Sequence, residues 1–228
     1  MANGQGWQGW IEERLELSKL AWLGTRLVPK GVGWWYTFGS ATLVAFILLV
    51  VTGISMMMNY SPSVDHAWDS LQFATTSVQF GGFVRSIHHW SAFAMVFLIG
   101  VHGLRVYLMG AFRFPREVTW IIGVFLILFV VGSAFTGYLL PWDQRAYWAV
   151  NVGANLAGEA PFVGSWIQKL LLGGNQIGTL TLARFFTLHV AVLPVVIGIA
   201  TVAHLFLVIR LGISAPPGKF RVSDDDKK

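Results

Sequence analysis

The sequence predicts an all-α integral membrane protein: a bundle of four transmembrane helices preceded by an amphipathic surface helix. Three observations predict this fold. The 228 residues are 55% hydrophobic and only 12% charged, whereas a soluble domain has about 25% charged residues. Four uncharged stretches reach the roughly 20 residues that a helix needs to cross a bilayer. Basic residues gather between these stretches, as expected for the loops of a membrane protein.

Residues 1–30 predict a surface segment rather than a membrane span. Within 10–23, apolar side chains fall near one helical face and charged side chains fall elsewhere. This pattern is typical of a helix that lies on the membrane surface, and a solvated cap helix is the alternative. The chain does not open with a basic stretch and a long apolar run, so we expect no cleaved signal peptide.

The membrane domain is predicted to cover residues 31–212, followed by a flexible polar tail over 213–228. Its four uncharged windows are 31–64, with a helix near 33–58, then 86–104, 118–142 and 185–209. The uncharged stretch 170–183 is short and contains the run Gly-Gly-Asn, so it is interpreted as loop. The long connection 141–183 is expected to carry function or to bind a partner.

The basic residues predict the orientation. Of the 16 Lys and Arg residues, 12 lie in the N-terminal arm, in 105–116 and in the tail from residue 210. Cytoplasmic loops collect such residues. We therefore expect a multi-pass protein of the bacterial cytoplasmic membrane with both termini in the cytoplasm, in preference to a thylakoid protein. The net charge of +5 is explained by topology, so no nucleic acid partner is expected.

Four of the six histidines lie in the second and fourth spans: His88, His102, His189 and His204. Ionisable residues inside a membrane are costly and are candidates for function. Spacings of 14 and 15 residues return to within about 40° and 60° of the starting direction, about 21 Å along the helix. Because the two helices run parallel, His88 should pair with His189 on the outer side, and His102 with His204 on the inner side. Two facing imidazoles at one depth form a bis-histidine haem site, so we expect two non-covalent b-type haems with these four residues as metal ligands.

Glycines in the other two spans repeat at the same interval. Gly39 and Gly53 are 14 residues apart, as are Gly123 and Gly137. Glycine lets a flat ligand approach the backbone, so both haems are expected to pack against these positions. Packing of helices through small residues is the alternative.

Three arginines lie near the histidines and are expected to bind haem propionates: Arg85, Arg105 and Arg184. Arginine holds carboxylates in bidentate fashion, although each could instead anchor a helix end. His89 points about a quarter-turn away from His88 and is expected at the surface. His66 lies beside Asp65 and Asp69, where a zinc site is a weak alternative to a structural role.

The chain resembles the cytochrome b6 type of cytochrome b, the short split form, over nearly its whole length. The resemblance rests on the segments RSIHHWSA, VHGLRVY, FPREVTWIIGV, TGYLLPWDQRAYWAV, LTLARFFTLHVAVLP and AHLFLVIRLGIS. The 15-residue gap from His189 to His204 also resembles this type, since mitochondrial-type cytochromes b have one residue fewer. The resemblance implies a low-potential outer haem and a high-potential inner haem. It further implies a Rieske iron–sulfur protein and a c-type cytochrome as partners, and a dimeric complex.

Two departures from the family pattern matter. The photosynthetic members carry a cysteine that attaches an additional c-type haem, and Thr37 occupies that place here. The chain has no cysteine at all, so a covalent third haem is not expected, and any iron–sulfur cluster with cysteine ligands must belong to a partner. The PEWY segment that helps to bind quinol is also absent, which implies a separate subunit, similar to subunit IV, that carries the remaining helices.

One wall of a quinol site is expected where the third span ends. Pro141 stops or bends that helix, which should expose an apolar surface beside the outer haem. By the resemblance this wall runs to about residue 152, and its suspected members are Gly137, Tyr138, Pro141, Trp142 and Ala149. A tryptophan anchor at the membrane interface is the alternative.

The sequence therefore predicts the dihaem cytochrome b subunit of a quinol:cytochrome c oxidoreductase, which is not catalytic alone. Electrons from quinol oxidised outside would pass through the two haems to a quinone site on the inner side, coupled to proton translocation. The alternatives are a dihaem membrane-anchor cytochrome of another quinone-linked oxidoreductase and a haem-free transporter. The anchors lack this layout of glycines and histidines, and a transporter would lack the matched glycine pairs.

Overall fold

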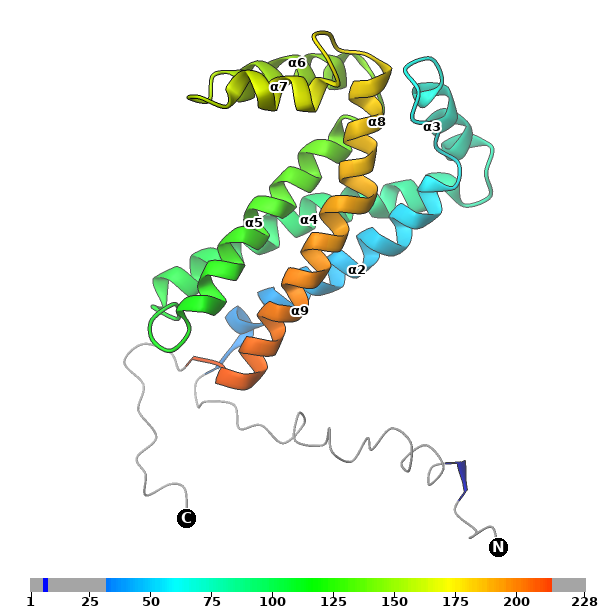
Figure 1. Ribbon diagram of the computed structural model, residues 1–228. Coiled ribbons are helices and arrows are strands. Elements are labelled where there is room, and N and C mark those ends of the chain that lie inside the picture. Colours follow the sequence, from blue (N-terminus) through cyan, green and yellow to red (C-terminus); the bar gives the residue numbers. More distant parts are fainter. Residues whose placement is uncertain (1–5, 8–31, 215–228) are drawn as a thin grey trace, which may run out of the picture.

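A computed structural model describes residues 6–7 and 32–214 (Figure 1). The predicted surface helix at 10–23 and the tail from residue 215 lie outside the described residues. Within the described part, every regular element is helical, and four helices are long and apolar enough to cross a membrane. The predicted fold class, an all-α membrane bundle, is thereby confirmed.

The four spans lie on the predicted windows, and the second extends beyond its window at both ends. They are α2 (Phe38–Met57), α4 (Gly81–Leu108), α5 (Glu117–Tyr138) and a composite fourth span formed by α8 (Thr179–Thr187), η3 (Leu188–Val192) and α9 (Leu193–Leu211). The first span begins later than predicted, because residues 34–36 form a separate 3-10 turn, η2 (Trp34–Tyr36). Thr37 closes this turn by donating its hydroxyl to the Trp34 carbonyl at 2.7 Å.

The interpretation of 170–183 as loop is wrong in its second half, where α8 already begins at Thr179. The fourth predicted window begins at residue 185, directly after Arg184. The Arg184 guanidinium donates to the Lys169 and Leu170 carbonyls beyond the helix. A charged side chain near a helix end that reaches polar partners is tolerated in a membrane span.

Three shorter helices gather at one end of the bundle, which we call the loop end: α3 (Ala67–Thr76), α6 (Gln144–Gly158) and α7 (Gly164–Leu172). Figure 1 shows α6 and α7 lying across this end, while α2 begins and α9 ends at the opposite end, the terminal end. Asp143 starts α6 by accepting the Ala146 N–H at 2.8 Å, an ordinary N-cap. A cluster of buried side chains joins α6 and α7 to α5 and α8: Leu139, Val150, Ala154, Leu172 and Phe185.

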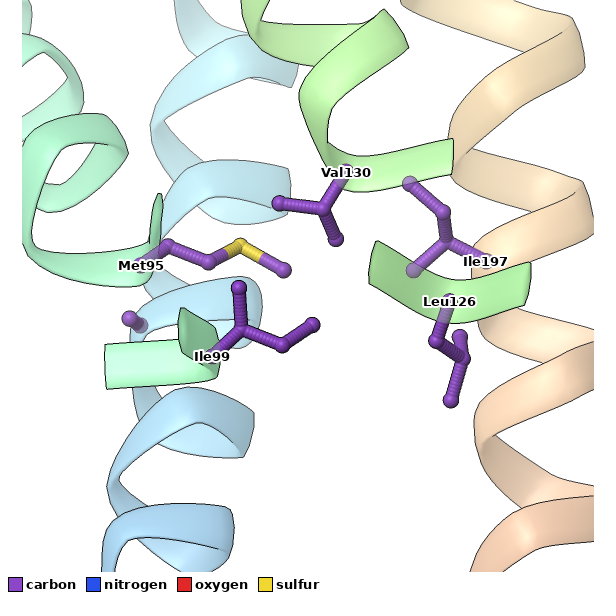
Figure 2. Close-up of a cluster of buried hydrophobic side chains, with 6 residues drawn as sticks. Met95, Ile99, Leu126, Val130 and Ile197 are labelled. Carbon is purple, nitrogen blue, oxygen red and sulfur yellow. The ribbon is translucent and has the colours of Figure 1, made fainter. Parts of the chain in front are cut away.

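A second apolar cluster fills the middle of the bundle. Figure 2 shows Met95 and Ile99 from α4 directed toward Leu126 and Val130 from α5, with Ile197 of α9 beside them. Met95 lies seven residues from both His88 and His102. The apolar cluster therefore separates two levels of the bundle, each of which contains a pair of histidines.

Candidate metal centres

At the loop end, His88 of α4 faces His189 of η3. Their ring centroids are 6.2 Å apart, and the ring planes meet at 75°. A metal–nitrogen bond of about 2.0 Å and an imidazole radius of about 1.1 Å place two rings on opposite sides of one metal about 6.2 Å apart. At this separation the two imidazoles could both bind one metal ion placed between them.

At the terminal end, His102 of α4 and His204 of α9 form the second pair. The His102 ring lies against Gly39 of α2, and the His204 ring lies against Gly123 of α5. The structure thus brings the histidines together in the combination that the parallel helices predicted, and α4 and α9 both run from the loop end to the terminal end (Figure 1).

Each of the four candidate glycines faces one histidine of the neighbouring helix. A Cβ added at Gly53 would lie 3.3 Å from Cε1 of His88, and one at Gly39 would lie 3.0 Å from Cε1 of His102. On α5, a Cβ at Gly123 would lie 3.3 Å from Cε1 of His204, and one at Gly137 would overlap the ring of His189. The 14-residue repeat therefore leaves room for imidazoles, and α2 and α5 each support the histidines of one partner helix.

The hydrogen bonds at the loop end place a proton on Nδ1 of both histidines. Thr52 donates its only hydroxyl proton to the Leu48 carbonyl at 2.6 Å, so it accepts from Nδ1 of His88 at 2.9 Å. Nδ1 of His189 lies 2.9 Å from the Ser133 carbonyl, which can only accept. The free lone pair of each ring is therefore on Nε2, the nitrogen that is available to bind a metal.

The terminal pair lacks such partners. Nδ1 of His102 and Nδ1 of His204 are buried, and neither makes a hydrogen bond within the described part of the chain. Thr52 and Thr136 were not among the residues predicted from the sequence. The available signal was the Thr-Gly pair that occurs at 52–53 and again at 136–137, but not at the other two glycines.

A π-helical turn places His189. This histidine belongs to η3, which directly precedes Pro194 near the start of α9. Proline has no N–H and cannot continue the regular pattern of bonds to the carbonyl four residues earlier. A π turn accommodates one additional residue, so the 15 residues from His189 to His204 turn the helix about as far as the 14 residues from His88 to His102.

The three candidate arginines have different surroundings. Arg105 is buried, lies three residues after His102 on α4, and has its guanidinium carbon 3.4 Å from the ring centroid of Tyr36. Its Nε and Nη2 atoms have no hydrogen-bond partner among the described residues. Arg85 donates to the Thr75 hydroxyl at 3.1 Å, and Arg184 is occupied by the carbonyls at the end of α7. Arg105 is thus the arginine with free donors beside a histidine pair.

The suspected quinol wall lies at the loop end. Gly137 faces His189, and Trp142 and Ala149 pack against the buried cluster around Leu139. Tyr138 is exposed, and Trp142 has a positive φ of 53° directly after Pro141.

Tyr60 holds this wall in place and was missed in the sequence. Its hydroxyl donates to the Leu140 carbonyl at 2.6 Å, and its ring stacks on Phe186 at 5.5 Å. Burial raises the pKa of Tyr60, so the phenol keeps its proton and remains a donor. The end of α2 is thereby tied to the segment after α5 and to α8.

The remaining histidines stay apart from both pairs. His89 is exposed and touches Trp90 and Phe93, with centroids 5.7 Å and 5.0 Å away. His66 precedes α3. Within the described residues no three His, Asp or Glu side chains form a group that could hold a metal ion, so the alternative zinc site at 65–69 does not form.

The chain is similar to known proteins of one family. The family described as Cytochrome b/b6/petB matches residues 23–212. Cytochrome b6 of Acaryochloris marina (strain MBIC 11017) is 45% identical over 208 residues, which are 91% of this chain and 97% of the relative. Cytochrome b6 of Synechococcus sp. (strain CC9902) is 41% identical over 217 residues, 95% of this chain and 100% of the relative.

A solved structure titled "Hyperthermophilic respiratory Complex III" contains a chain of the same fold. It superposes with a TM-score of 0.87 at 28% sequence identity and matches 95% of this chain. The chain spans 58% of the length of that solved chain. With its four spans, its family match and these relatives, the chain belongs to the cytochrome b/b6 family.

Proposed function

We propose that the chain is the dihaem cytochrome b subunit of a quinol:cytochrome c oxidoreductase. The observation that carries the proposal is the 6.2 Å separation of the His88 and His189 rings, which would let both imidazoles bind one haem iron. Electrons from quinol oxidised on the outer side pass through two b-type haems to a quinone site on the inner side, and quinol chemistry on opposite sides couples this transfer to proton translocation.

In this function the chain binds and orients two haems. A bound b haem supplies a one-electron carrier. His88 and His189 hold one at the loop end, and His102 and His204 hold the other at the terminal end. Thr52 and the Ser133 carbonyl keep Nδ1 protonated at the loop end, so Nε2 remains available as the ligand.

Arginines complete the haem sites. Arg105 offers two buried donors beside His102, which suits a propionate carboxylate because arginine binds carboxylates through paired N–H groups. Arg85 and Arg184 are proposed for the other haem, where each would exchange its present partner, the Thr75 hydroxyl or the α7 carbonyls, for a propionate.

The quinol site is proposed at the loop end, next to His189. Gly137, Tyr138, Pro141, Trp142 and Ala149 form one wall. The bond from Tyr60 to the Leu140 carbonyl supports this placement, because it fixes the backbone directly before Pro141.

From the resemblance to the split cytochrome b6 type, we infer a second subunit, similar to subunit IV, that carries the remaining helices and completes the quinol site. Of the two electrons of each quinol, one goes to a Rieske iron–sulfur protein and a c-type cytochrome outside while the other passes through the haems, and the complex is a dimer. The loop end faces outward and both termini lie in the cytoplasm, in a bacterial cytoplasmic membrane, as the basic residues indicate.

Optical difference spectra of the purified complex test this proposal. The wild type should show two b-type haems in reduced-minus-oxidised spectra, and His102→Ala or His204→Ala should remove the same one. His88→Ala should remove the other, with the His102 haem retained. A wild-type complex without b-type bands would leave the transporter alternative, and loss of the loop-end haem on replacing His204 would show the pairing to be wrong.

A further inference from the structure

The two histidine pairs differ in the hydrogen-bond partners of their Nδ1 atoms. At the loop end, Nδ1 of His88 contacts the Thr52 hydroxyl at 2.9 Å. Nδ1 of His189 contacts the Ser133 carbonyl at 2.9 Å and the Thr136 hydroxyl at 3.4 Å. At the terminal end, Nδ1 of His204 and Nδ1 of His102 are buried and make no hydrogen bond within the described residues.

The sequence explains this difference. Threonine precedes the facing glycine at both loop-end positions, as Thr52-Gly53 and Thr136-Gly137. Both hydroxyls donate backward to the preceding helical turn, so their lone pairs face the imidazoles. At the terminal end the residues in the same place are apolar, Phe38 before Gly39 and Ile122 before Gly123, and they offer no acceptor.

We propose that Thr52, assisted by Thr136, is a positioning residue that lowers the redox potential of the loop-end haem. An acceptor on Nδ1–H makes the imidazole a more basic ligand. A more basic axial ligand stabilises ferric iron more than ferrous iron, because ferric iron carries the larger positive charge. The one-electron reduction of this haem is therefore less favourable than it is without the threonine. The inference rests on the proposed function, because it requires that both pairs ligate haem.

The contact distances indicate that Thr52 has a larger effect on the haem potential than Thr136. Its contact is 2.9 Å, a normal hydrogen bond, whereas the 3.4 Å contact of Thr136 is long. His189 also keeps the Ser133 carbonyl when Thr136 is replaced. Loss of the Thr52 hydroxyl should thus have the larger effect.

Redox titration of the full complex in its membrane tests the proposal. Thr52→Val removes the hydroxyl at nearly constant shape. One hydrogen bond shifts an equilibrium by about threefold to tenfold, so the loop-end haem should rise in potential by about 30 to 60 mV for one electron. The terminal-end haem should not change.

Three further variants control for structural effects. Thr52→Ser keeps a hydroxyl, so the loop-end haem should keep its wild-type potential. Thr42→Val should leave both potentials unchanged, because Thr42 is also buried on α2 and donates to a carbonyl four residues earlier at 2.9 Å, with no histidine contact. Ile122→Thr places a hydroxyl before Gly123 and should lower the potential of the terminal-end haem.

The outcomes separate this inference from the proposed function. If both haems are present and Thr52→Val leaves the loop-end potential unchanged, or if Thr42→Val shifts it equally, the inference is overturned. If Thr52→Val does not retain the haem, Thr136→Val provides the same comparison, with a smaller shift in the same direction expected and an unchanged or lowered potential contradicting the proposal. Absence of two b-type haems from the wild type would overturn the proposed function itself.

Discussion

Replacing Gly137 by alanine should selectively weaken the loop-end haem site. The added Cβ would lie 2.9 Å from both Nδ1 and Nε2 of His189 and closer still to Cε1. Carbon atoms normally approach to about 3.5–4.0 Å, so the ring must move by at least about 0.6 Å. It can escape only by turning away from the position in which it faces His88 and donates to Ser133.

The alanine substitution should therefore weaken haem binding at the loop end. Overpacking by one methyl group costs about 1–3 kcal/mol, which corresponds to roughly a 5- to 150-fold weaker haem affinity at that site. The matched change at Gly53 should cost less, because its Cβ would lie 3.3 Å from the His88 ring and small shifts can relieve the contact. Gly132→Ala is the control on the same helix, where the new Cβ meets nothing within 4 Å.

The assay is the haem-to-protein ratio of the purified complex, together with its difference spectrum and melting temperature. Gly137→Ala should lose the loop-end signal first during purification or on dilution, while the terminal-end signal persists. Gly132→Ala should retain both haems and gain up to about 0.5–1 kcal/mol of helix stability. A Gly137→Ala complex with two fully retained haems, or equal haem loss in Gly132→Ala, would refute the reasoning.

Three other outcomes are expected. Peroxidase staining of the denatured subunit should give no haem band, because Thr37 forms no thioether and the chain has no cysteine; a band that survives organic extraction would contradict this. Ala149→Phe should slow quinol oxidation or confer resistance to outer-site inhibitors while both haem spectra stay intact; normal turnover and sensitivity, with changes near Arg210 altering both, would place the quinol site at the other end. Tyr60→Phe should destabilise the protein by about 1–3 kcal/mol, because the Leu140 carbonyl loses its 2.6 Å partner; an unchanged melting temperature would argue against this tie.

The spans could be predicted because a membrane tolerates few charges, and charge-free windows therefore follow the helices. The same criterion failed at α8, where Arg184 reaches polar carbonyls across a loop. The two levels of histidines followed from helical periodicity. The contact between Thr52 and His88 could not be predicted from the sequence, because side-chain rotamers and the distance between helices decide whether a hydroxyl reaches Nδ1. The π turn before Pro194 was equally hidden, since a proline permits several local adjustments of the preceding turn.

The apolar cluster between the two histidine levels has an electrical consequence. Its members Ala45, Met95, Ile99, Leu126, Val130 and Ile197 carry no group that can bind or release a proton. An electron that crosses this layer under the proposed function travels without a compensating proton. Moving one charge through the full membrane potential involves about 2.3 kcal/mol per 100 mV. Under the proposed function, this apolar layer would keep the charges at the two levels apart, so electron transfer between the levels would add to the membrane potential.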